Sequence, residues 1–167
     1  MHARVGALHR SASHSFSKHS TPTLQFVTGL GVEGDAHFGA TVRHRSRVSA
    51  DPAQPNLRQV HLLPQEHLDE FAAAGFAVEP GALGENVTTV GLDLHALPTG
   101  TLLRFADGPL LALTGLRNPC QQIEGFLPGL LDHVLRRSAD GRIERRGGVM
   151  AVVLVGGTVR VGDMIAV

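Results

Sequence analysis

Short apolar runs separated by glycine and proline constrain the fold of this chain more than any other feature. The sequence contains 20 Gly and 9 Pro among 167 residues, and they end most runs after a few positions. This punctuation is typical of strands joined by turns, and no alternation of strands with helices accompanies it. The sequence therefore predicts a mainly β fold, a closed or nearly closed β-barrel with a few peripheral α-helices. The expected strands cover residues 5–8, 24–28, 58–63, 87–90, 101–105, 110–114, 149–155, 158–161 and 164–167.

The end of the chain carries a sharp local signal. Two β-rich runs, residues 149–155 and 158–161, flank the pair Gly156-Gly157. Two glycines between such runs are the sequence signature of a two-residue hairpin turn. We therefore expect these two strands to pair with each other.

Two helices and one further hairpin are expected within the β-rich sequence. Residues 64–75 begin with proline, carry acidic residues early and end at glycine, as helices do. Leucines and valines recur at helical spacing over residues 126–138. The runs 101–105 and 110–114 are expected to pair around an Asp-Gly turn.

Composition argues against several classes of partner. Lys and Arg total 15, Asp and Glu also total 15, and both Trp and Tyr are absent. Nucleic acid and acidic membranes normally require a basic surface, and single-stranded nucleic acid also requires aromatic stacking, so neither partner is expected. No apolar run reaches the length of a membrane span or a secretory leader. The single cysteine cannot form an internal disulfide, which agrees with a reducing compartment. We expect one cytoplasmic domain over residues 1–167.

The only cysteine, Cys120, lies at a position suited to chemistry. It follows the expected strand 110–114 and the turn-forming pair Asn118-Pro119, which would present it at the mouth of the strand. A thiolate there would be stabilised by the Arg117 guanidinium and by a helix that begins just after the sulfur. The alternative is a buried structural cysteine, the more frequent fate of a free cysteine.

A glycine-rich segment, residues 29–39, carries Asp35 and His37. Its glycine spacing fits neither a dinucleotide-binding loop nor a Walker loop. Asp35 and His37 are either metal ligands or partners in a local turn, and the turn is favoured. A zinc or iron site is a further hypothesis, although no spacing among its residues resembles an established site. That site would gather Asp35 and His37 with His14, His19 and His61.

Three other polar segments have two readings each. Residues 10–20, rich in Ser and His, form either a mobile connection or a loop whose hydroxyls, amides and Lys18 share a phosphate. Residues 41–56 form either a solvated surface or a lid over an anionic ligand. Glu85 and Asn86 either cap a loop or present a carboxylate and an amide to a heterocycle. The basic cluster of the second segment consists of Arg43, His44, Arg45 and Arg47.

A set of motifs links nearly the whole chain to one family. They are, in order, GVEGDAHFG (31–39), RQVHL (58–62), PGALGENVTT (80–89), GLDL (91–94), TGLRNPC (114–120) and GD (162–163). With these motifs the chain resembles the MOSC domain, named after the C-terminal part of molybdenum-cofactor sulfurase, and in particular its short stand-alone bacterial members. The resemblance implies a β-barrel with peripheral helices and a cleft for the pyranopterin of the molybdenum cofactor.

The resemblance also implies residue roles. Cys120 stands where characterised relatives have a cysteine thiolate that ligates molybdenum or is proposed to handle sulfur. Asn86, next to Glu85, matches a polar contact to the pterin. Arg117 and Asn118 lie where the phosphate or the pterin should meet the cysteine loop. Further polar positions resemble the family without a defined role, namely Lys18, Asp35, His37, Arg58 and His61.

Two functions follow from this resemblance. We expect a molybdenum-dependent reductase of N-hydroxylated compounds, and the alternative is a sulfur carrier or cofactor-handling module that uses a Cys120 persulfide. The chain has neither the cysteines of an iron–sulfur cluster nor a desulfurase domain. Electrons would therefore come from a separate redox partner, and sulfur from a separate cysteine desulfurase that carries pyridoxal phosphate. A third hypothesis is that the protein has the same barrel but binds another phosphorylated small molecule, and that Cys120 has a structural role.

Overall fold

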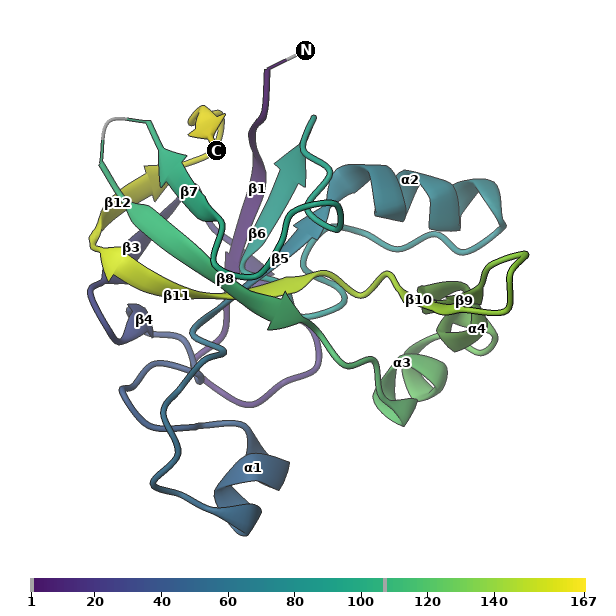
Figure 1. The fold of residues 1–167 in the computed structure, drawn as a ribbon, viewed down its shortest axis with the longest axis horizontal. Helices are drawn as coiled ribbons and strands as arrows, with labels where there is room; N and C mark the ends of the chain where they lie inside the picture. Colours follow the sequence, from purple (N-terminus) through teal and green to yellow (C-terminus); the bar gives the residue numbers. More distant parts are fainter. Residues whose placement is uncertain (1, 107) are drawn as a thin grey trace.

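The computed structural model describes residues 2–106 and 108–167 and is organised around an eight-stranded sheet (Figure 1). Strands β5 and β6 are parallel, and all other neighbours in this sheet are antiparallel. The mainly β prediction is confirmed. In spatial order the strands are β13 (Ile165–Ala166), β7 (Leu102–Phe105), β8 (Leu110–Leu116), β11 (Val149–Val155), β5 (Val60–Pro64), β6 (Val87–Val90), β1 (Arg4–Arg10) and β2 (His19–Ser20).

Two smaller sheets complete the β structure. One contains β12 (Gly157–Arg160), β3 (Thr23–Val27) and β4 (Gly31–Val32), and the other contains β9 (Leu135–Arg137) and β10 (Ile143–Arg145). The main hydrophobic core joins residues of the eight-stranded and three-stranded sheets. Phe26 of β3 and Phe105 of β7 meet edge to face there, with ring centroids 5.9 Å apart.

The prediction of a closed barrel is wrong. The eight-stranded sheet is open, because its edge strands β13 and β2 do not pair with each other. β1 meets the segment before β13 through the isolated bridge Arg4–Met164 and through backbone hydrogen bonds of Val5 with Gly162 and Asp163. Both edge strands have only two residues, which is too short to carry a ladder of backbone hydrogen bonds across the gap.

The predicted terminal hairpin is also wrong, although both of its strands exist. β11 pairs with β8 and β5, whereas β12 pairs with β3 in the other sheet. The chain changes sheets at Gly156, whose N–H donates to Oγ1 of Thr28 at 2.9 Å. A Cβ atom at Gly156 would lie 2.7 Å from the carbonyl oxygen of Phe26, so the glycine permits a close strand crossing rather than a tight turn.

The helix prediction succeeds once and fails once. Helix α2 (Gln65–Ala73) lies within the expected range and buries Leu68 and Phe71. The single helix expected over residues 126–138 is instead α3 (Gln121–Phe126), α4 (Leu130–Val134) and strand β9. Gly129, with φ +87°, interrupts the helical course between α3 and α4.

The helices form two lobes on either side of a hollow. Helix α1 (Arg45–Ala50) lies in the polar segment 41–56, and in Figure 1 it projects at the bottom. Helices α2, α3 and α4 pack on a second apolar cluster, which includes Leu63, Phe71, Leu83 and Ile123. Among the described residues no helix has the length and apolar character to cross a membrane.

Gly148, just before β11, gives a test of how closely the chain packs against β5. Its φ is +95°, and an added Cβ would meet the carbonyl oxygen of Leu62 and lie 2.7 Å from Nε2 of His61. We expect Gly148→Ala to lower the free energy of unfolding by about 2–4 kcal/mol, because backbone strain and a clash with backbone add together. Urea denaturation measures this loss.

Gly100→Ala is the matched control for that experiment. Gly100 also has positive φ, +91°, but an added Cβ would meet nothing within 4 Å. Only the strain of about 1 kcal/mol is expected there. Equal losses in the two variants would contradict the close approach at Gly148.

Candidate functional site

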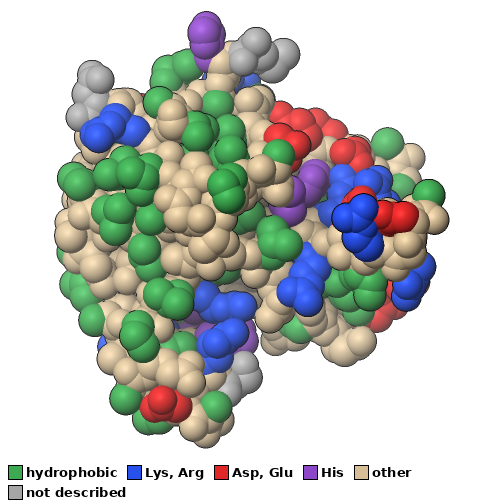
Figure 2. All heavy atoms as spheres, in the orientation of Figure 1, with side chains coloured by type: hydrophobic (Ala, Val, Ile, Leu, Met, Phe, Trp, Pro, Cys, Tyr) green, Lys and Arg blue, Asp and Glu red, His purple; other side chains and the backbone are tan. Residues whose placement is uncertain are grey.

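A cavity of about 170 Å³ opens between the α1 lobe and the lobe of α3 and α4. Figure 2 shows this hollow, with Lys, Arg and His side chains gathered at its margin. The lining residues include a lysine, three arginines and four histidines, and none of those described is a carboxylate. They are His14, Ser15, Phe16, Lys18, His37, His44, Arg45, Arg58, His61, Leu83, Gly84, Asn86, Arg117, Asn118, Cys120, Gln122 and Met150.

Close backbone packing brings two sequence-distant loops together at this cavity. A Cβ at Gly84, where φ is +82°, would lie 2.6 Å from the carbonyl oxygen of Phe16. A Cβ at Gly81 would lie 2.6 Å from the His9 ring, and the Lys18 N–H donates to the Gly81 carbonyl at 2.9 Å. Glycine is therefore required where the loop before β6 lies against the Ser/His loop after β1.

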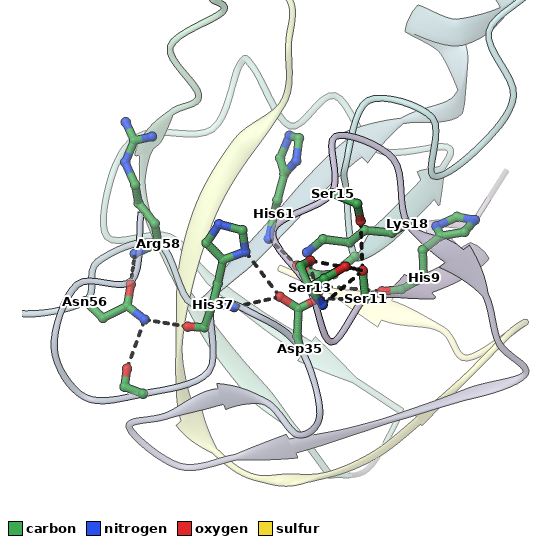
Figure 3. A network of polar contacts seen from close by, with 12 residues as sticks. His9, Ser11, Ser13, Ser15, Lys18, Asp35, His37, Asn56, Arg58 and His61 are labelled. Atoms are coloured by element: carbon green, nitrogen blue, oxygen red, sulfur yellow. Dashed lines mark hydrogen bonds and ion pairs between the residues drawn. The ribbon is translucent and has the colours of Figure 1, made fainter. Parts of the chain in front are cut away.

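A buried carboxylate, Asp35, holds one wall of the cavity together (Figure 3). Its Oδ2 atom forms an ion pair with Nζ of Lys18 at 2.8 Å and accepts hydrogen bonds from Asn86 Nδ2 and the Ser11 N–H. Its Oδ1 atom accepts the His37 N–H at 3.1 Å and lies 3.2 Å from His37 Nδ1. Burial alone would raise the pKa of Asp35, but the hydrogen bonds from His37 and the Lys18 ammonium outweigh it and hold the pKa well below its usual range.

Lys18 and Asp35 thus neutralise each other inside the protein. Their side chains are 4% and 0% exposed. Burial lowers the pKa of Lys18, while the charge of Asp35 opposes that shift. The local-turn interpretation of Asp35 and His37 agrees with the hydrogen bonds, and Asp35 lies behind the lining residues rather than among them.

Glu85 and Asn86 act as loop caps in this geometry. Both amide hydrogens of Asn86 are used inside the protein, on the His9 carbonyl and on Asp35, and its Oδ1 accepts the His61 N–H. Oε1 of Glu85 accepts the Gly81 N–H at 2.6 Å, while burial raises the pKa of this carboxyl. The contact of Asn86 and Glu85 with a pterin stays a prediction.

Arg117 and Cys120 also line the cavity. Nη1 of Arg117 is buried and has no hydrogen-bond partner among the described residues. Burial lowers the pKa of Arg117, against the opposing charges of Cys120 and Glu85. Cys120 is exposed and lines the cavity just before α3, so the alternative of a buried structural cysteine is wrong.

The remaining predicted residues differ in their surroundings. Nε2 of His61 lies 2.7 Å from the Gly147 carbonyl, and burial together with Arg117 holds the pKa of His61 well below its usual value. Its neutral ring therefore donates from Nε2. Arg58 is half-buried, and burial and the charges of Arg47 and Arg117 lower its pKa. Asn118 is exposed and accepts from Arg145 at 3.0 Å.

Residue motifs therefore located most of the cavity but missed part of it. Of the predicted site residues, Asp35 and Glu85 do not line the cavity and the others do. The basic cluster in residues 41–56 was expected to be either a solvated surface or a lid over an anionic ligand, and its His44 and Arg45 line the cavity. Of the other lining residues, His14, Ser15 and Phe16 belong to the Ser/His loop, and His44 and Arg45 belong to the basic cluster. Leu83, Gly84, Gln122 and Met150 had no predicted role.

The histidines at the cavity form ring contacts rather than a metal site. His14 packs edge to face on His37 with ring centroids 5.3 Å apart, and His37 lies 6.3 Å from His44. Within residues 2–106 and 108–167, no group of three or more His, Cys, Asp or Glu is arranged to hold a metal ion. The zinc or iron hypothesis is therefore not supported by this geometry.

Comparison with known proteins identifies the family. The sequence model of the MOSC domain matches residues 33–166. The chain belongs to the MOSC domain family. No curated protein sequence matches this MOSC domain at a significant level.

Solved structures agree with the fold of this MOSC domain. The YuaD protein from Bacillus subtilis is 28% identical, with a TM-score of 0.80 over 99% of this chain and 94% of that chain. YiiM from Geobacillus stearothermophilus is 16% identical, with a TM-score of 0.66 over 98% of this chain and 74% of that one. YiiM from Escherichia coli is 22% identical, with a TM-score of 0.59 over 97% of this chain and 68% of that one. At these identities the two YiiM proteins share the fold.

The depressed pKa of Asp35 predicts a pH-dependent contribution to the stability of the MOSC domain. Because the pKa is lower in the native state than in the unfolded chain, the unfolded chain binds the proton first. The stabilisation is therefore complete above the ordinary aspartate pKa of about 4 and is lost as pH falls below it. We expect wild type to be more stable than Asp35→Asn by about 3–5 kcal/mol at pH 7, since the variant leaves Lys18 buried and unpaired.

Urea denaturation of both proteins between pH 7 and pH 3 checks this prediction. The difference in unfolding free energy should stay constant down to about pH 4 and then shrink. Buried histidines such as His9, whose pKa burial lowers to about 4, are present in both proteins, so their titration cancels in the difference. A difference that does not change at acid pH would show that Asp35 is not held ionised.

Proposed function

We propose that this MOSC domain binds the molybdenum cofactor in the cavity, with Cys120 as a thiolate ligand of molybdenum, and reduces N-hydroxylated compounds with electrons from a separate donor protein. The observation that carries the proposal is the buried Nη1 of Arg117, a donor to which residues 2–106 and 108–167 offer no acceptor. A buried donor left unpaired costs about 1–3 kcal/mol, so the site favours a ligand that supplies an acceptor.

The charge of the cavity supports an anionic ligand. Asp35 neutralises Lys18, but no carboxylate lines the cavity beside Arg45, Arg58 and Arg117 among the described residues. The phosphate of the cofactor matches these guanidinium groups. The Cys120 sulfur is a soft donor of the kind that suits molybdenum in a sulfur-rich ligand field. The residues present therefore fit the cofactor, with Arg117 for the phosphate and Cys120 for the metal.

When bound, the cofactor supplies the two-electron redox chemistry needed to break an N–O bond. The reaction also consumes two protons, since an N–H and an O–H bond form as water leaves. His37 is suited to move a proton: ionised Asp35 holds the proton at Nδ1, which leaves Nε2 as the ring nitrogen that Asp35 does not bind. His61 is less suited, because its neutral ring donates Nε2–H to Gly147.

Metal and pterin content test the proposal directly. Wild-type protein and Cys120→Ala are purified in parallel from a host that makes the cofactor. We expect near-stoichiometric molybdenum in wild type and at least about a tenfold loss in Cys120→Ala, whereas pterin is retained through Arg117. Because Cys120 is exposed, the variant should unfold at the same urea concentration as wild type. Absence of molybdenum and pterin from wild type, even after reconstitution, would contradict the proposal and favour another phosphorylated ligand.

A sulfur carrier is the second candidate, and the exposure of Cys120 favours it. A thiol at the rim of the cavity is accessible to a second protein, so a cysteine desulfurase with pyridoxal phosphate could transfer sulfur to it as a persulfide. Turnover separates the two functions. With the cofactor-loaded protein, reduced methyl viologen and benzamidoxime, we expect steady formation of benzamidine. A carrier would bind cofactor but reduce nothing.

A further inference from the structure

A second cavity, of about 250 Å³, adjoins the first. The two cavities share Arg58 and Met150 in their walls, so they meet at this pair of side chains. The site described above leaves the second cavity without a role. Its walls come from the α1 segment, the segment before β5 and the end of β8.

Two arginines give the second cavity its charge. Arg47 belongs to α1, and Arg58 precedes β5. No described residue that lines the cavity is acidic, and neither guanidinium forms an ion pair within residues 2–106 and 108–167. The charges of Arg47 and Arg117 add to burial in lowering the pKa of Arg58. The positive charge here is therefore uncompensated, and an anion would stabilise it.

An apolar wall faces these arginines. Leu57 and Leu116 line the cavity while remaining 57% and 41% exposed. The Thr114 hydroxyl donates to the Leu57 carbonyl at 2.5 Å and so fixes the position of this wall. A Cβ at Gly115 would meet nothing within 4 Å, which leaves open space beside the wall. Flat apolar surface next to guanidinium groups suits a ring that carries an anionic group.

We propose that the second cavity binds the substrate, an N-hydroxylated aromatic or heteroaromatic compound that carries a carboxylate or phosphate. The ring lies against Leu57 and Leu116, and the anionic group binds Arg47 and Arg58. The N-hydroxylated end reaches past Met150 into the first cavity, which Cys120 also lines. This inference rests on the proposed reductase function, because it assigns that reaction its substrate class.

Binding to the cofactor-free protein tests the cavity without any turnover. The probes are benzamidoxime and 4-carboxybenzamidoxime, which differ by one carboxylate, and calorimetry gives the dissociation constants. We expect wild type to bind the carboxylate compound at least about tenfold more tightly, since a charged hydrogen-bonded contact contributes about 1.5–3 kcal/mol. Arg47→Met, which leaves Arg58 in place, should lose most of this preference.

Arg43→Met is the matched control, because it removes the same charge from the same segment and Arg43 lines neither cavity. It should keep the full preference. Equal binding of the two probes by wild type would overturn the proposal. An equal loss of the carboxylate preference in Arg43→Met and Arg47→Met would overturn it as well.

Pterin content distinguishes the substrate from a phosphate-bearing extension of the cofactor, which presents similar chemistry. Arg47→Met purified from the cofactor-producing host should retain the pterin content of wild type. Loss of pterin in this variant would assign the second cavity to the cofactor and overturn the substrate proposal. If the reductase function itself is wrong, turnover is absent although the carboxylate preference of the cofactor-free protein persists, so the two failures are distinguishable.

Discussion

The buried carboxylate of Asp35 is the interaction on which the cavity depends. It ties Lys18 from the loop after β1, Asn86 from just before β6 and His37 from the segment after β4 into one wall. A buried charge without its partner costs several kcal/mol, so these segments hold one another in place. Because the charge of Lys18 is neutralised by Asp35, the arginines alone provide the positive charge that a ligand meets. This holds for both cavities.

The positions of most strands could be predicted from the sequence, but their pairing could not. Apolar and β-branched runs between turn residues mark a strand wherever it pairs. The pair Gly156-Gly157 has the same local sequence whether it closes a hairpin or lets β12 leave for another sheet. The choice depends on Thr28 and Phe26, which contact Gly156 from far away in the sequence. Likewise, leucine spacing predicted one helix where the left-handed backbone of Gly129 separates two.

Most residues that the motifs singled out line one cavity, because motifs carry residue identity, while the roles of these residues stay predictions. Cys120 and Arg117 are among the lining residues. The sequence could not distinguish a residue that lines the cavity from one that supports it, and Asp35 is a supporting residue. The sequence left two readings for the basic cluster around Arg45 for a different reason. A basic cluster looks the same on an open surface as on a cavity wall, and only the placement of α1 decides between them.

The crossing at Gly156 also determines how the chain must fold. Thr28 and Gly156, which join the two sheets, are 128 positions apart, whereas β3 and β4 pair through a short local turn. Long-range strand pairing requires closure of a large loop and is slow compared with local pairing. Until β12 arrives, the outer edge of β3 has free N–H and C=O groups that could pair with a strand of another molecule. The main hazard for this protein is therefore aggregation during synthesis and refolding, before β3 acquires its second neighbour.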